Sequence, residues 1–338
     1  MKTKITILGA GNMGTALARV LGDSGHAVTM WNYAGDPDPL NQIAAYHENK
    51  KYLPGITLSK NICAEHDLAD ALRGARLVIL AVPSSIVERQ LEAATPFLPA
   101  SAVLVDVSKG FTGVFDKEKT VLSTAAQKWW NKRIIISGPA VAADIAKGGF
   151  TTMSIAGKNK KDIIFAQQVL TSSHLHFLST TDVLGIKLAG SLKNVYAILL
   201  GMADGLNLTL NTKAFLVVRA LEEMSLLIKK CGGKAETPHA LAGLGDLVAT
   251  GLSPVSRNRR FGEYLGQGLD RVSAEKAVGQ VVEGVPASEG AMKLAHKHNI
   301  RLPLVELVYT AAWKGRSPVR LFEKILSKDY VQKKGRSR

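Results

Sequence analysis

The sequence predicts an α/β protein in which a doubly wound, mostly parallel sheet is followed by an all-α C-terminal domain. From residue 4 to about residue 180, short β-branched and apolar runs alternate with stretches of helical periodicity, which is typical of a parallel sheet covered by helices on both faces. After about residue 185, long helical stretches and glycine-rich turns replace this alternation. We therefore expect one domain at residues 1–185, a helical domain at 186–330 and a basic tail at 331–338.

Length and composition fit two soluble domains. The chain has 338 residues, of which 46% are hydrophobic and 21% are charged, close to the averages of globular proteins. These values exclude a disordered, collagen-like or disulfide-rich chain. No uninterrupted apolar run approaches the roughly 20 residues of a membrane-spanning helix, so we expect no stable membrane insertion. Two cysteines can form at most one bridge, which favours a reducing compartment.

The basic excess is the unusual feature of the composition. Lysine and arginine number 43 against 28 acidic residues, a formal charge of +15, which invites a nucleic-acid or membrane partner. However, residues 316–338 alone carry eight basic and two acidic side chains, and the end of this segment is typical of a solvated tail. We therefore expect no nucleic-acid partner, and a non-catalytic nucleotide-sensing protein stays as an alternative.

The expected elements follow in order from the apolar runs. Six segments are expected as strands, at residues 5–8, 28–31, 77–82, 103–107, 134–136 and 152–155. Most of them are nearly continuous apolar or β-branched runs, as buried parallel strands are. A helix is expected at residues 15–21, directly after the first strand. In the second domain, helices are expected at residues 192–202 and 214–230.

A glycine-rich turn joins the first strand to the first helix. Gly9, Gly11 and Gly14 match G-x-G-x-x-G, the Rossmann-like fingerprint in which glycines allow the tight turn, the approach of a pyrophosphate and close helix packing. The same glycines interrupt the N-terminal apolar run, which a secretory signal does not explain. We expect a cytoplasmic, uncleaved protein that binds NAD or NADP at this turn.

The choice between NAD and NADP stays open. An NAD site usually has an Asp or Glu at the end of the second strand. Here Asn32 and Tyr33 follow that strand, and Asp36 lies further on. The sequence shows neither a well-placed acid nor an arginine for a 2′-phosphate.

Two lysines are candidates for the chemistry. Lys109 follows the strand at residues 103–107, at the strand end where open α/β sheets bind ligands. It is either a loop charge in solvent or a ligand for an anion or carbonyl, and we favour the ligand. Lys193, next to Asn194, interrupts an otherwise apolar helix. It is either a lysine whose ammonium reaches solvent at the helix end or a catalytic lysine tuned by partial burial.

A third segment combines an acid with a candidate anion site. Asp246 lies in an apolar, glycine-rich loop, and Ser256 precedes Arg257 at the start of a predicted helix. A serine cap would present N–H groups and a guanidinium together to an anion, although capped helices with exposed arginines are also common. We see no convincing cluster of metal ligands and expect no metal.

In its motifs and their order, the sequence resembles the bacterial type of NAD(P)-dependent glycerol-3-phosphate dehydrogenase. The resemblance covers nearly the whole chain and rests on residues 9–18, 49–55, 108–110, 137–139, 191–195, 241–247, 256–258 and 281–284. It implies that the protein reduces dihydroxyacetone phosphate to sn-glycerol 3-phosphate for phospholipid synthesis, and that it forms a homodimer. A β-hydroxyacid dehydrogenase with the same two-domain plan is the alternative enzyme.

The resemblance also implies roles for individual residues. Lys193 would donate a proton to the carbonyl oxygen, with Lys109 and Asp246 as further catalytic residues that contact the substrate. The other implied substrate contacts are Gly138, Ala140, Ser256, Arg257 and Asn258. The implied cofactor contacts are Gly9, Gly11, Asn12, Met13, Gly14, Lys109, Ala142, Arg257, Val281 and Glu283.

The sequence departs from the family pattern at several positions. Met13 replaces a tryptophan, and Ala140 and Val141 replace a serine and a phenylalanine in the substrate loop. Asp144 replaces a glutamate, and Asn32 stands where many members have an arginine. Ala140 can bind only through its backbone. We expect these changes to alter affinity or cofactor preference rather than to abolish activity.

Overall fold

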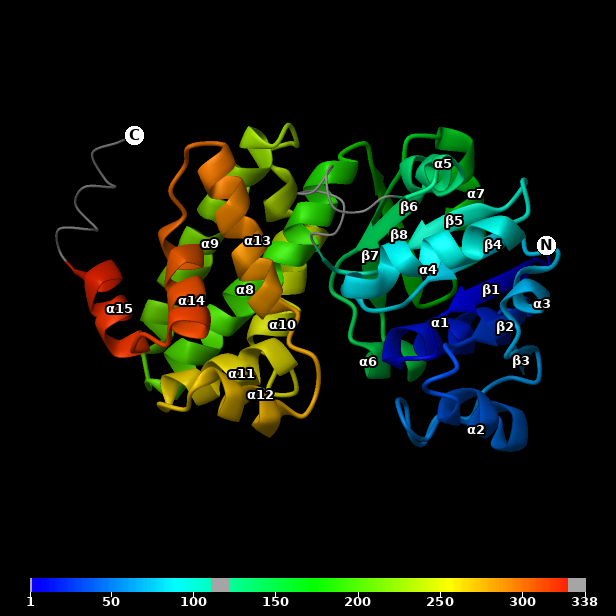
Figure 1. The fold of residues 1–338 in the computed structure, drawn as a ribbon, viewed down its shortest axis with the longest axis horizontal. Helices are drawn as coiled ribbons and strands as arrows, with labels where there is room; N and C mark the ends of the chain where they lie inside the picture. The colour runs from blue at the N-terminus through cyan, green and yellow to red at the C-terminus, as the bar shows by residue number, and fades with distance from the viewer. Residues whose placement is uncertain (1, 111–121, 328–338) are drawn as a thin grey trace. The chain divides into compact units, whose positions relative to one another are not determined.

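The computed structural model describes residues 2–110 and 122–327, so the basic tail expected at 331–338 lies outside the described residues. The chain divides into two compact units, one up to Lys187 and the other from Leu188 onward. Figure 1 labels the helices and strands of both units.

An eight-stranded sheet forms the centre of the N-terminal unit, in the order β3-β2-β1-β4-β5-β6-β7-β8 (Figure 1). The strands are β1 (Lys4–Leu8), β2 (Ala27–Trp31), β3 (Ile62–Ala64), β4 (Leu77–Leu80), β5 (Val103–Asp106), β6 (Ile134–Ser137), β7 (Thr151–Ala156) and β8 (Leu175–Thr180). Neighbouring strands are parallel except for the β6–β7 pair. This confirms the predicted mostly parallel sheet.

The sequence did not predict β3 and β8, the two edge strands. Each has a neighbour on one side only within the sheet, and neither is a continuous buried run. In β8, His176 is half-buried and Leu178 is exposed. Edge strands lack the all-apolar pattern of central parallel strands because part of their surface faces solvent.

Helices cover both faces of this sheet, as a doubly wound fold requires. They are α1 (Asn12–Asp23), α2 (Asp38–Tyr46), α3 (Leu68–Leu72), α4 (Val87–Ala94), α5 (Thr124–Lys132), α6 (Ala142–Ala146) and α7 (Lys160–Leu170). Successive residues of β4 alternate between two buried clusters: Ile79 packs in the cluster that contains Leu17 of α1, whereas Leu80 packs in the one that contains Leu91 of α4. Because successive side chains of a strand point to opposite faces, the two clusters are the two faces of the sheet.

The C-terminal unit is helical. Its helices are α8 (Val183–Gly205), α9 (Leu210–Lys230), α10 (Asp246–Gly251), α11 (Arg257–Gly266), α12 (Arg271–Val278), α13 (Gly284–Lys297), α14 (Pro303–Lys314) and α15 (Pro318–Leu326). By length and composition alone α8 could cross a membrane, but 89% of its apolar window is buried inside the protein, as in a core helix. The two helices predicted here lie within α8 and α9.

Glycines let α8 and α11 touch backbone to backbone. A Cβ atom at Gly201 of α8 would lie 1.9 Å from the carbonyl oxygen of Arg259, and one at Gly262 of α11 would lie 2.0 Å from that of Ile198. No side chain fits at these distances, so only glycine allows this approach. The contact fixes the start of α11 relative to the middle of α8, and both segments carry predicted site residues.

A buried carboxylate joins three helices of the same unit. Glu223 of α9 accepts hydrogen bonds from the backbone N–H groups of Leu304 and Val305, at 2.8 and 3.2 Å, and from the Tyr196 hydroxyl of α8 at 3.3 Å. The carboxylate thus satisfies free N–H groups in the first turn of α14. Burial, reinforced by Glu223, raises the pKa of Tyr196 well above its usual value.

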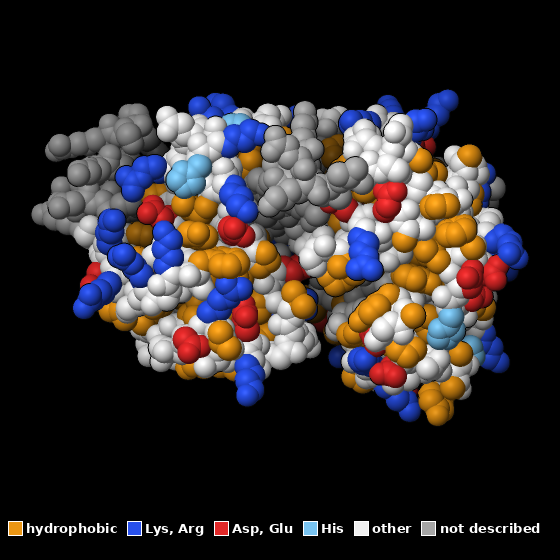
Figure 2. All heavy atoms as spheres, in the orientation of Figure 1, with side chains coloured by type: hydrophobic (Ala, Val, Ile, Leu, Met, Phe, Trp, Pro, Cys, Tyr) orange, Lys and Arg blue, Asp and Glu red, His pale blue; other side chains and the backbone are white. Residues whose placement is uncertain are grey.

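Positive side chains are spread over the surface in Figure 2. On the face shown, lysine and arginine side chains occur on both units and are interspersed with acidic and apolar ones. The described side chains of this face therefore form no continuous basic stripe of the kind that binds nucleic acid.

Candidate active site

The glycine-rich turn has the shape that a pyrophosphate requires. A Cβ atom at Gly9 would lie 2.6 Å from the oxygen of Ala81, and one at Gly14 would lie 2.0 Å from the oxygen of Gly9, whereas one at Gly11 would meet nothing within 4 Å. Gly9 also has a φ of +113°. The first and third glycines are thus packing positions, and the second faces open space. Helix α1 begins there without a side-chain cap, so its first N–H groups suit a phosphate.

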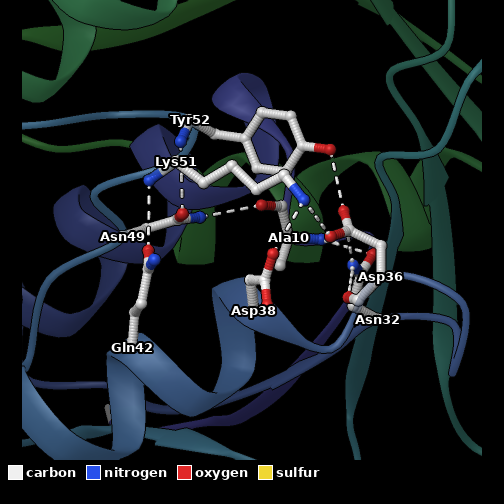
Figure 3. Close-up of polar contacts among 8 residues, drawn as sticks. All are labelled: Ala10, Asn32, Asp36, Asp38, Gln42, Asn49, Lys51 and Tyr52. Carbon is white, nitrogen blue, oxygen red and sulfur yellow. Dashed lines mark hydrogen bonds and ion pairs between the residues drawn. The ribbon is translucent and has the colours of Figure 1, made fainter.

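Two asparagines hold this turn in place (Figure 3). The Ala10 N–H donates to Asn32 Oδ1 at 3.3 Å, and the Ala10 carbonyl accepts from Asn49 Nδ2 at 2.8 Å. Asn49 is fully buried and also donates to the Thr15 hydroxyl in α1. The residue between the first two glycines is therefore fixed from both sides before any ligand binds.

The fold brings an acidic side chain, Asp36, to the end of β2, where the sequence did not show a well-placed acid. Asp36 folds back through a turn in which its N–H donates to the Tyr33 carbonyl at 3.0 Å. Its carboxylate accepts from Lys51 Nζ at 2.7 Å, the Tyr52 hydroxyl at 2.8 Å and Asn32 Nδ2 at 3.3 Å (Figure 3). Burial opposes ionisation of Asp36, but these hydrogen bonds outweigh it, so its pKa lies below the usual value. The sequence signal for this turn is Gly35, directly before the acid.

Lys109 and Gly138, two of the expected substrate contacts, lie together. They follow β5 and β6, which are parallel neighbours, so both lie at the same edge of the sheet. The half-buried Lys109 donates from Nζ to the Gly138 carbonyl at 3.2 Å. Lys109 is therefore not an isolated loop charge in solvent.

Lys193 forms a buried cluster with two residues of α10. Its Nζ donates to Asp246 Oδ1 at 2.9 Å and to the Thr250 hydroxyl at 2.5 Å, and that hydroxyl donates to Asp246 at 3.2 Å. Lys193 is 5% exposed and Asp246 is 1% exposed. Lys193 lies in the middle of α8 rather than at its end, so the interpretation as a lysine reaching for solvent is wrong.

A π-helical turn presents Asp246. Residues Leu241–Gly245 form this turn immediately before α10, and π-turns are frequent at functional sites. A Cβ atom at Gly243 would lie 2.1 Å from the Pro238 carbonyl oxygen, so the turn packs against backbone. Sequence reasoning missed Thr250, although it stands four residues after Asp246 and so shares its helix face.

Two asparagines connect α8, α11 and α13. Asn258 Nδ2 donates to Asn194 Oδ1 at 2.9 Å, and Asn258 Oδ1 accepts from the Gly284 N–H at 2.9 Å. Asn194 is buried, and its Nδ2 has no partner among residues 2–110 and 122–327. A buried amide without a partner is costly, so Asn194 is a donor suited to a ligand, one beyond the predicted set.

The remaining predicted residues lie as follows. Ser256 caps α11, accepting from the Arg259 N–H at 3.3 Å, which confirms the predicted cap, and Arg257 is exposed. Met13, in the first turn of α1, is half-buried and packs on the apolar core. Asn12 is exposed at the start of α1, and Ala142 is the first residue of α6. Ala140 is half-buried. Before α13, Val281 is exposed and Glu283 is half-buried.

The chain matches two family models that together cover most of its length. Residues 4–163 match the N-terminal part of NAD-dependent glycerol-3-phosphate dehydrogenase, and residues 182–323 match its C-terminal part. A glycerol-3-phosphate dehydrogenase of Bacillus velezensis, named as using NAD(P)+, is 34% identical, with 96% of this chain and 94% of the relative aligned. One of Moorella thermoacetica is 37% identical over 94% of this chain and 93% of the relative.

Solved structures of the same family are also similar to this chain. The chain is similar to glycerol-3-phosphate dehydrogenase of Coxiella burnetii, with a TM-score of 0.88, 34% identity, and coverage of 97% of this chain and 99% of that one. A ketopantoate reductase of Ralstonia eutropha shares the fold alone, with a TM-score of 0.59 at 15% identity over 95% of this chain and 99% of that one.

Proposed function

The chain belongs to the NAD-dependent glycerol-3-phosphate dehydrogenase family, and we propose how its residues perform the reaction of that family. The protein is an NAD(P)-dependent oxidoreductase that reduces dihydroxyacetone phosphate to sn-glycerol 3-phosphate. A β-hydroxyacid dehydrogenase or a non-catalytic nucleotide sensor is not favoured, because the family models and the relatives described above are glycerol-3-phosphate dehydrogenases.

The buried ammonium of Lys193 carries the mechanistic proposal. The nicotinamide, when bound, supplies the hydride that reduces the carbonyl carbon. Negative charge then develops on the carbonyl oxygen, and Lys193 Nζ donates a proton to it, leaving a neutral amine. In the reverse direction the neutral amine accepts the hydroxyl proton. Asp246 and Thr250 hold Nζ by hydrogen bonds of 2.9 and 2.5 Å, so the amine needs little reorganisation during the reaction.

The other substrate contacts are proposed from charge and hydrogen-bonding capacity. Arg257, with Ser256 and the first N–H groups of α11, suits the doubly charged phosphate. Asn194 Nδ2 and Lys109 Nζ are donors suited to the substrate oxygens. Asn258 has both ends of its amide engaged within the helical unit, so its contribution includes holding Asn194. Gly138 and Ala140 would bind through backbone groups.

The residues of the glycine-rich turn fit a dinucleotide. Gly11 leaves open space where the pyrophosphate approaches, and α1 begins there with its N–H groups uncapped by a side chain. We propose that Asn12, Met13, Lys109, Ala142, Arg257, Val281 and Glu283 complete the cofactor site. A homodimer in the cytoplasm that supplies glycerol 3-phosphate for phospholipid synthesis is part of the same proposal, supported by the family resemblance.

A steady-state assay tests the function. Purified protein is mixed with dihydroxyacetone phosphate and NADH or NADPH, and loss of the reduced nicotinamide is followed by absorbance. We expect turnover that depends on the phosphate of the substrate, so dihydroxyacetone serves as the control. Absence of turnover with both cofactors, together with oxidation of a 3-hydroxyacid, would establish the alternative enzyme instead.

A further inference from the structure

A network of charged side chains lies beside the glycine-rich turn at the end of β2 (Figure 3). In dinucleotide-binding folds, the adenosine ribose meets the residues that follow this strand, where an acid binds the 2′-hydroxyl or an arginine binds a 2′-phosphate. Here Asn32 follows β2 directly and accepts the Ala10 N–H at 3.3 Å. Asn32 therefore lies at the strand end where this rule places the adenosine ribose.

Asn32 is uncharged, and the charge beside it comes from Asp36 and from the side chains linked to Asp36. Its Nδ2 donates to the Asp36 carbonyl at 2.7 Å and to Asp36 Oδ2 at 3.3 Å. Asp36 is buried, with 8% of its side chain exposed. An ionised carboxylate thus lies one hydrogen bond from Asn32, the residue that directly follows β2.

A single lysine joins two carboxylates in this network. Lys51 Nζ lies 2.7 Å from Asp36 Oδ1 and 3.1 Å from Asp38 Oδ2. Hydrogen bonds to the two carboxylates raise the pKa of Lys51, so the ammonium stays protonated. The three groups carry a net charge of −1, and the segment at residues 32–38 contains no lysine or arginine. Asp38, with 59% of its side chain exposed, presents this negative charge to solvent.

We infer that Asp36, Asp38 and Lys51 make this enzyme select NADH over NADPH at the adenosine ribose. The inference rests on the proposed function and specifies its cofactor. A 2′-phosphate would bring two negative charges to a network that is already negative, whereas a 2′-hydroxyl is neutral. Lys51 cannot turn to a 2′-phosphate without cost, because the buried Asp36 would lose its ammonium partner.

Direct binding to the full-length protein tests the preference. Isothermal titration compares NADH with NADPH, and 5′-AMP with adenosine 2′,5′-bisphosphate, which differ only by the 2′-phosphate. We expect each ligand without that phosphate to bind at least about tenfold tighter, and the difference to shrink at high salt because exposed charges are screened. Equal or tighter binding of the 2′-phosphorylated ligands overturns the inference and leaves the dehydrogenase function standing. Binding of neither cofactor overturns both.

Two variants identify the cause of the preference. Asp38→Asn removes an exposed charge and should tighten NADPH binding about fivefold, with NADH affinity nearly unchanged. Asp36→Asn removes a buried charge of the same network and should also tighten NADPH binding. The matched control is Asp162→Asn on α7, a helix that packs on β5, β7 and β8. An NADPH affinity that neither Asp36→Asn nor Asp38→Asn raises, or that Asp162→Asn raises equally, contradicts the assignment.

Discussion

Lys193 Nζ lies 2.9 Å from Asp246 Oδ1, and both side chains are almost completely buried. Two charges taken out of water cost several kcal/mol each before their attraction and hydrogen bonds compensate. Such a pair contributes little net stability compared with apolar residues of the same size. Its position in the middle of α8, next to Asn194, whose Nδ2 has no partner among residues 2–110 and 122–327, is therefore best explained by chemistry.

Replacing Lys193 by methionine should lower kcat by at least about two orders of magnitude, because the proton donor is lost. The measurement is the steady-state rate with dihydroxyacetone phosphate, together with the melting temperature to check the fold. Lys230→Met, at the exposed end of α9, is the matched control and should leave kcat unchanged. Near-normal turnover of Lys193→Met would remove this residue from the mechanism.

Thr250 is a positioning residue, and its hydroxyl should matter more than its methyl group. Thr250→Val keeps the shape but loses the 2.5 Å contact with Lys193 Nζ, so we expect kcat to fall about tenfold and its pH profile to shift. Thr250→Ser keeps the hydroxyl and should restore most of the rate. Equal effects of the two substitutions, with no change in the pH profile, would instead indicate a packing role.

Alanine substitutions at Gly11 and Gly14 should affect different properties, cofactor affinity in the first case and stability in the second. The Cβ of Gly11→Ala enters open space, so the variant should melt like the wild type but bind the dinucleotide at least about tenfold more weakly. The Cβ of Gly14→Ala would lie 2.0 Å from the Gly9 oxygen, so this variant should lose about 2 kcal/mol of stability. Thermal melting and cofactor titration separate the two effects. Unchanged cofactor affinity in Gly11→Ala would argue against a pyrophosphate at this position.

Gly201→Ala should separate α8 from α11. The added methyl group would lie 1.9 Å from a backbone oxygen, which cannot move as a side chain can, so we expect a loss of about 3 kcal/mol in the free energy of unfolding. Denaturant unfolding measures this loss. Because α11 also carries Asn258 and Arg257, the residual folded protein should show a raised KM for the substrate. A stable variant with a normal KM would mean that the two helices can move apart freely.

Asp36 should contribute stability that depends on pH. Its pKa is lowered in the folded protein, while the unfolded chain has the ordinary carboxyl value of about 4. Its stabilisation is therefore fully present above that value and is lost as the pH falls through the lowered pKa. Wild type should exceed Asp36→Asn in stability at neutral pH, and the difference should shrink in acid. Tyr52→Phe should remove part of the same dependence, and a difference that is constant with pH would contradict this account.

The sequence by itself determined the parallel sheet, the dinucleotide turn and the candidates Lys109, Lys193 and Asp246. These features are local, because strand patterns, glycine spacing and strand ends can be recognised within a few residues. It did not determine the edge strands β3 and β8, since a partly exposed strand lacks the continuous apolar run.

Only the tertiary structure decided which side chains meet. Thr250 touches a lysine 57 residues before it in the sequence, and Asp36 reaches the end of β2 because a turn folds it back onto Asn32. Asn194 is a candidate because its Nδ2 is buried without a partner among the residues that the structure describes, which depends on the packing around α8. Such relationships depend on how helices and strands pack across long separations, and packing is a property of the folded chain rather than of any short segment.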